Sequence, residues 1–126
     1  MKIDFVANAG SSNIVDAYSD AAIVVDRKSY HSSLILSATR IIDDWPPQTC
    51  QELTARHLQP VVTMDPEIVL IGTGSKIVFP EDETLLPITS NRIGYEIMDT
   101  GAACRSYNYL VAEGRRVVAA LFMIGR

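Results

Sequence analysis

The sequence contains few of the residues that usually bind metals or carry covalent catalysis. Its 126 residues include two cysteines and two histidines. Cys50 and Cys104 form no CxxC pair, and their spacing from His31 and His57 matches no zinc pattern. We therefore expect neither a metal nor a cofactor. Two cysteines in a chain of this length also do not make a disulfide framework.

Positive charge is scarce as well. Lysine and arginine together number 11 against 15 aspartates and glutamates, which gives a net charge of −4 at neutral pH. A nucleic-acid-binding protein needs a basic face that releases counterions from phosphates, so we expect no nucleic-acid partner. The content of 48% hydrophobic and 21% charged residues is ordinary for a globular protein.

Long apolar runs are missing too. The longest, residues 117–124, is far shorter than the roughly 20 residues that span a bilayer, so we expect no transmembrane segment. Residues 1–8 contain neither the apolar core of a signal peptide nor the arginines of a mitochondrial presequence. These features predict a cytoplasmic protein, and the length fits a single domain over residues 1–126.

The first half of the chain has a β pattern followed by a helix signal. Between residues 13 and 44, β-rich stretches alternate with turn signals every 6–10 residues, which is typical of an antiparallel β-meander or ribbon. Thr49 and Glu52 match a capping box. This predicts a short helix over residues 49–58, with Pro60 closing it.

The second half predicts a βαβαβ core over residues 67–123. Strands are expected at residues 67–71, which are nearly all apolar, and at residues 95–98 and 117–123. A helix is expected from Asp99 or Thr100 to Glu113. The element order favours an α/β, or mixed α+β, fold in which antiparallel ribbons precede a mixed sheet with helices on one face.

The segment between the first two of these strands leaves two alternatives open. Glu81, Asp82 and Glu83 suit the positive end of a helix, but Pro87 is unfavourable in a helix interior. Either two short turns form here, or a helix begins near Thr84 with Pro87 in its first turn.

Two predicted strands end in small, polar, glycine-containing turns, Gly72-Thr73-Gly74-Ser75 and Asp99-Thr100-Gly101. In a parallel sheet both turns would open at the edge where α/β proteins bind ligands. The first turn lacks the third glycine of a dinucleotide fingerprint, because position 77 is isoleucine, and Lys76 does not complete a P-loop. The competing interpretation of the first turn is a tight turn without a chemical role, and that of the second is an ordinary helix cap.

Three side chains of the following helix complete the candidate site. Cys104 lies one turn into the helix, where the dipole would lower its pKa, but its apolar neighbours favour burial. Arg105 and Asn108 are three residues apart and share a helix face. An arginine there would hold a carboxylate or phosphate, so a small anion is one candidate ligand, while a solvated helix face is the plainer interpretation.

The second half also resembles a known family. The stretches that carry the resemblance are residues 66–74, 79–80, 94–108 and 110–117, together with 16–18 and 45–46. They resemble a family of small bacterial and archaeal proteins of uncharacterised function that includes the mitochondrial respiratory complex I assembly factor 3. The resemblance spans residues 13–123 and implies a three-layer fold, an α/β core with added β-ribbons. It brings no established catalytic residues.

Two hypotheses about function follow. The resemblance favours a non-enzymatic interaction module, which docks a protein partner or a second copy through an apolar sheet face or the Trp45-Pro46-Pro47 segment. The alternative is a protein that binds a small anion or metabolite, or a weak enzyme. Its crevice would lie between Gly72–Ser75 and Asp99–Gly101, with Arg105 facing into it.

Overall fold

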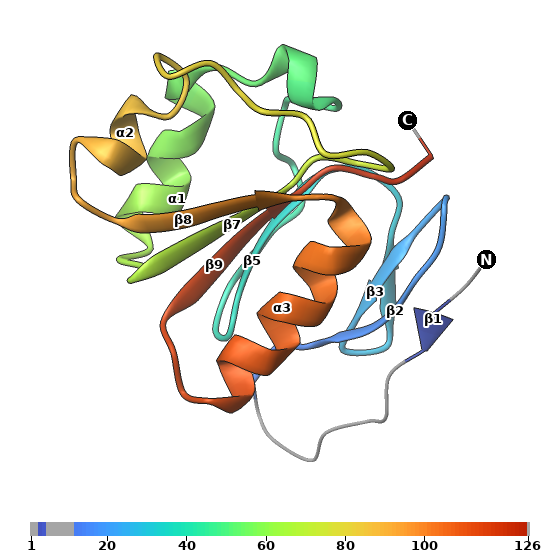
Figure 1. Cartoon of the computed structure of the whole chain (residues 1–126). Coiled ribbons are helices and arrows are strands. Elements are labelled where there is room, and N and C mark those ends of the chain that lie inside the picture. The colour runs from blue at the N-terminus through green and yellow to red at the C-terminus, as the bar shows by residue number, and fades with distance from the viewer. Residues whose placement is uncertain (1–2, 5–11, 126) are drawn as a thin grey trace.

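Two β-sheets form the framework of the part of the chain that the structure describes (Figure 1). This computed structural model describes residues 3–4 and 12–125. The smaller sheet has the strand order β1-β2-β3-β4, and the larger has the order β6-β5-β9-β7-β8. The strands are β1 (Ile3–Asp4), β2 (Val15–Tyr18), β3 (Ile23–Val25), β4 (Lys28–Tyr30), β5 (Leu34–Ser37), β6 (Ile41–Ile42), β7 (Ile68–Gly72), β8 (Gly94–Met98) and β9 (Val117–Leu121).

The larger sheet is mixed, as expected. Strand β7 lies parallel to both β8 and β9, with Ile68 opposite Gly94 on one side and Val117 on the other. Strand β5 runs antiparallel to β9 and to β6. The predicted βαβαβ core is confirmed as β7, α2 (Leu86–Thr89), β8, α3 (Thr100–Ala112) and β9.

The antiparallel section between residues 13 and 44 divides between the two sheets. Strands β2, β3 and β4 pair in the smaller sheet, whereas β5 and β6 belong to the larger one. Between β4 and β5, the buried Ser33 donates its hydroxyl to the carbonyl oxygens of Trp45 and Pro47. The antiparallel pattern is confirmed. The change of sheet was not predicted, because strands of either sheet show the same local alternation.

Helices cover both faces of the larger sheet, so the expectation of one covered face is wrong. Leu70 of β7 packs with Tyr107 of α3 and with the smaller sheet, whereas Val69 and Ile71 pack against Leu58 and Ile88 on the opposite face. The cause is topological. Strands β8 and β9 flank β7 on opposite sides, and right-handed crossovers that run in opposite directions lie on opposite faces.

The single helix expected over residues 49–58 is also wrong. The chain there forms two 3-10 turns, η1 (Cys50–Glu52) and η2 (Ala55–Leu58), and then the short helix α1 (Gln59–Thr63). Pro60 stands in the first turn of α1 and so opens a helix that it was expected to close. The first turn suits proline because its backbone nitrogen needs no partner there. Pro87 lies likewise in the first turn of α2, as in the second alternative, although α2 begins only at Leu86 and a turn over residues 82–85 precedes it.

The capping box was assigned to the wrong residues. Thr49 makes no side-chain cap, and the Glu52 carboxylate accepts a hydrogen bond of 3.2 Å from the backbone N–H of Gln48. The backbone N–H of Thr54 instead donates to Nδ1 of His57 at 3.0 Å. His57 therefore has a local structural role in the turn before α1.

Candidate functional site

The two glycine-containing turns lie side by side, as the parallel strands require. The backbone N–H of Thr73 donates to the carbonyl of Met98 at 2.9 Å, and the N–H of Thr100 donates to the carbonyl of Gly74 at 2.9 Å. Each turn therefore supplies hydrogen-bond partners to the other. The predicted juxtaposition is present, but these bonds use polar groups that a ligand would need.

The space between the turns is filled by the protein itself. Thr100 is fully buried, and its hydroxyl oxygen accepts from the N–H of Gly74 at 2.8 Å and donates to the carbonyl of Phe122 at 2.7 Å. A Cβ at Gly72 would lie 3.0 Å from both the Cβ of Ala103 and the Cα of Thr100. The small residues of these turns thus permit close packing of α3 on the sheet.

Asp99 and Gly101 have equally structural surroundings. The Asp99 carboxylate accepts from the N–H of Ala102 at 2.9 Å, which is the geometry of a helix N-cap. A Cβ at Gly101 would meet the ring of Tyr18 at 3.0–3.2 Å, so the glycine lets β2 approach the start of α3. The helix-cap interpretation accounts for both residues.

Thr73 and Ser75 face a different part of the molecule. They line a small cavity of about 150 Å³ together with residues 48–51 and Lys76. The Thr73 hydroxyl donates to the carbonyl of Lys76 at 2.6 Å and accepts from the N–H of Val78 at 3.0 Å. The cavity does not include Asp99–Gly101, so the predicted site residues are not brought together around one space.

Arg105 and Asn108 share a helix face, as predicted, and that face meets the smaller sheet. A guanidinium nitrogen of Arg105 donates to the hydroxyl oxygen of Tyr18 at 2.5 Å. The Asn108 amide accepts from the N–H of Val15 and donates to its carbonyl, both at 2.9 Å. Asn108 thus acts as the hydrogen-bond partner of β2, which aligns α3 with the smaller sheet.

Cys104 lies in the core. It is fully buried, and burial raises the pKa of its thiol to about 12, although the charge of Arg105 acts in the opposite direction. A nucleophilic cysteine needs the reverse, an accessible thiol with a lowered pKa. Burial also raises the pKa of the Cys50 thiol. In the described residues, no three histidine, cysteine, aspartate or glutamate side chains are grouped so that they could hold a metal ion.

The burial of Cys104 gives a first prediction. A maleimide probe at neutral pH should leave Cys104 unmodified in the native protein for hours and label it within minutes in denaturant, because reaction requires an exposed thiolate. Cys50 is 7% exposed and is the internal comparison, since it should react before Cys104. Peptide mass spectrometry distinguishes the two sites, and rapid native labelling of Cys104 would contradict its placement in the core.

Trp45 does not form the exposed docking surface considered above. Its ring is 2% exposed, stacks on Phe122 at 5.1 Å between centroids, and donates from Nε1 to the carbonyl of His57 at 2.9 Å. The tryptophan therefore fixes the segment before η1 to the end of β9.

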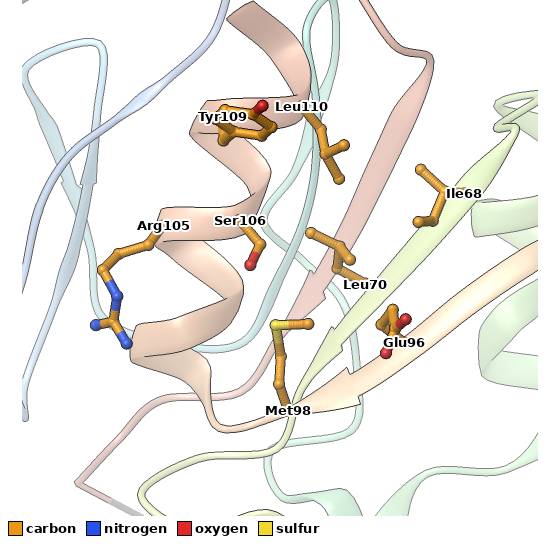
Figure 2. Close-up of a pocket in the computed structure, with 8 residues that line it drawn as sticks. All are labelled: Ile68, Leu70, Glu96, Met98, Arg105, Ser106, Tyr109 and Leu110. Carbon is orange, nitrogen blue, oxygen red and sulfur yellow. The ribbon is translucent and has the colours of Figure 1, made fainter. Parts of the chain in front are cut away.

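A groove that was not predicted lies beside α3 (Figure 2). Its volume is about 460 Å³. The lining side chains come from three elements: Ile68 and Leu70 of β7, Glu96 and Met98 of β8, and Arg105, Ser106, Tyr109 and Leu110 of α3. In Figure 2, Ser106 and Leu110 point toward the strands, whereas the Arg105 guanidinium points away from them. The groove is mostly apolar, and sequence patterns gave no signal for it because it forms where α3 leaves β8 uncovered.

The sequence of the groove and core elements matches a known family. Residues 15–122 match the model of a family whose description is "Protein of unknown function (DUF498/DUF598)". The chain belongs to this family. The match confirms the resemblance found from the sequence, and the family description assigns no activity.

Named relatives extend the DUF498/DUF598 assignment. A Francisella tularensis protein named 13 kDa major membrane protein is 33% identical over 101 residues, covering 79% of this chain and 82% of that protein. The bovine NADH dehydrogenase [ubiquinone] 1 alpha subcomplex assembly factor 3 is 28% identical over 109 residues, covering 85% of this chain and 59% of the bovine protein. This chain therefore spans about three fifths of that assembly factor.

Solved structures confirm the fold of this DUF498/DUF598 member. A crystal structure of a Bordetella parapertussis protein is 36% identical and has a TM-score of 0.84, covering 92% of this chain and 99% of that one. No helix in the described part of the chain is long and apolar enough to cross a membrane. The cytoplasmic location and the absence of a nucleic-acid partner stay predictions.

Proposed function

We propose that this DUF498/DUF598 protein is a non-enzymatic interaction module that helps other proteins to assemble. The observation that carries the proposal is the groove between α3 and the β7–β8 edge of the sheet, where Ile68, Met98 and Leu110 are only partly buried. Tyr109, on its rim, is 67% exposed. Apolar surface of this kind, with a polar rim, is typical of protein-binding sites.

The surroundings of the reactive side chains support the same proposal. Cys104 is buried, and the hydroxyl of Thr100 is engaged with the backbone. The relatives named assembly factor 3 give independent support, because their name describes a role exercised through other proteins. The polar groups between the two turns are bonded to one another, which argues against the alternative of anion binding there.

The proposal is tested by filling the groove. Ser106 is partly buried and points toward Leu70, so Ser106→Trp would place an indole ring over the groove floor. Ala112 is exposed at the last turn of α3 and is absent from the groove lining, so Ala112→Trp is the matched control. The tagged chain is cross-linked in the cells that produce it, and retained proteins are quantified by mass spectrometry.

We expect the wild type and the Ala112→Trp variant to retain the same proteins, and the Ser106→Trp variant to lose them at least tenfold. Losing a single hot-spot contact costs about 2 kcal/mol or more, which exceeds the roughly 1.4 kcal/mol of a tenfold change in affinity. Circular dichroism and thermal melting establish that both variants are folded. Equal retention by all three chains would contradict an interaction role for the groove.

A further inference from the structure

Strand β8 is an open edge of the larger sheet. The strand order places β8 at one end and β6 at the other. Strand β6 has two residues, whereas β8 has five, and Gly94, Tyr95 and Glu96 are exposed. An exposed edge strand of this length presents unpaired backbone groups to any chain that can add a further strand.

The direction of the free backbone groups follows from the pairing with β7. Met98 is opposite Gly72, and its carbonyl accepts from the N–H of Thr73, so the backbone groups of Met98 point toward β7. Because these groups alternate along a strand, the N–H and C=O groups of Tyr95 and Ile97 point outward. In the described residues they have no backbone hydrogen bond to a turn or loop. Two donors and two acceptors are therefore available along the edge.

The side chains beside this edge combine apolar surface with one negative charge. Glu96 and Met98 lie on the groove side of β8, next to Leu70 (Figure 2). Within the described residues the Glu96 carboxylate makes neither an ion pair nor a hydrogen bond. Arg105, the cationic residue of the groove, is bonded to Tyr18 and directs its guanidinium away from Glu96. The charge of Glu96 is therefore left for a binding partner.

The geometry points to one kind of occupant: an extended segment of a partner protein that adds beside β8 as a further strand and places a lysine or arginine on Glu96. This inference rests on the interaction role proposed above and names its partner. Backbone hydrogen bonds to Tyr95 and Ile97 would supply affinity, and alternate side chains would supply specificity. The residue opposite Met98 would be apolar, so the segment carries a basic residue two positions from an apolar one.

Charge disfavours a second copy of the chain as the occupant. Two β8 strands that pair antiparallel through Tyr95 and Ile97 would be centred on Glu96, which would face Glu96 of the other copy. Like charges directly opposite one another on a sheet are destabilising. A basic segment from another protein meets the same carboxylate with attraction.

The test uses the whole chain and a displayed library of random nine-residue peptides. We expect selected peptides to carry a lysine or arginine two positions from an apolar residue, and selection against the Glu96→Lys variant to enrich acidic residues instead. Tyr95→Pro removes one outward donor at an edge position that tolerates proline, and it should weaken binding at least tenfold. Tyr95→Val, which keeps the donor, should weaken it less than threefold.

Hydrogen exchange on the wild-type chain tests the same inference without depending on whether the Tyr95→Pro variant folds. On saturation with a selected peptide, hydrogen exchange at the N–H groups of Tyr95 and Ile97 should slow at least tenfold, while the N–H of Met98 is protected with or without peptide. Selected peptides that lack a basic residue, or unchanged exchange at Ile97, would overturn strand addition. A dimer in sedimentation that Tyr95→Pro dissociates would also overturn it, because the second copy would then be the occupant.

The two proposals fail in different ways. If Ser106→Trp abolishes partner retention while Tyr95→Pro leaves it and peptide binding intact, the groove binds proteins but not by strand addition. If neither substitution affects retention, the interaction role itself is wrong.

Discussion

Replacing Tyr107 by alanine is expected to lower the free energy of unfolding by about 3–5 kcal/mol. Tyr107 is fully buried in α3 and is among the largest side chains of the cluster between α3 and the two sheets. Its removal leaves a cavity that the surrounding strands cannot close without moving. Chemical denaturation with urea measures the change, which should appear as a lower midpoint with an unchanged slope.

The hydroxyl of Tyr107 provides the control. It donates to the carbonyl of Asn13 at 2.8 Å, and burial raises the pKa of the phenol, so the group is neutral at any ordinary pH. Tyr107→Phe keeps the ring and removes this one hydrogen bond, which should cost about 1 kcal/mol. If Tyr107→Ala were no more destabilising than Tyr107→Phe, the ring would not be part of the core.

Replacing Thr100 by valine is expected to lower the free energy of unfolding by about 2–4 kcal/mol, although the two side chains have nearly the same shape. The buried Thr100 hydroxyl joins the N–H of Gly74 to the carbonyl of Phe122, and valine would leave both groups without a partner in the interior. An unsatisfied buried backbone group costs about 1–3 kcal/mol. Thermal melting should show a decrease in Tm of several degrees.

Thr100→Ser distinguishes the contribution of the hydroxyl group to stability from that of the methyl group. Serine keeps both hydrogen bonds and loses one buried methyl, a cost of about 1 kcal/mol. The expected order of stability is therefore wild type, then serine, then valine. The reverse order for the two variants would show that Thr100 contributes by packing and that its hydrogen bonds add little.

Thr100 also connects stability with the proposed function. It stands at the start of α3, which forms one wall of the groove, and its backbone N–H is bonded to the turn after β7, which forms part of the floor. The hydrogen bonds between the two turns therefore help to fix the distance between α3 and β7 across the groove. In this way the residues first considered as a ligand site determine the shape of the surface that we propose binds proteins.

The elements of the second half were predictable because each was marked by a local physical signal. The helix cap at Asp99 and the apolar run of β7 both have the predicted structure. The prediction was wrong between residues 49 and 60. Thr49 and Glu52 have the residue types of a capping box, but the capping hydrogen bond forms between Thr54 and His57. When two candidate capping residues lie a few positions apart, the one that begins the helical turn is decided by how the following segment packs on the sheet.

The sequence alone determined the family, the βαβαβ order and the juxtaposition of the two turns, because these depend on local periodicity and on the rule that parallel strands end at one edge. Only the tertiary structure decided that Cys104 is buried, that Asn108 binds the backbone of β2, and that β8 is an open edge beside an apolar groove. The reason is that the exposure of a side chain and the pairing of a strand depend on which residues lie next to them in space. The residues that cover Cys104 or leave β8 uncovered come from distant parts of the chain, and no local pattern records which of them will meet.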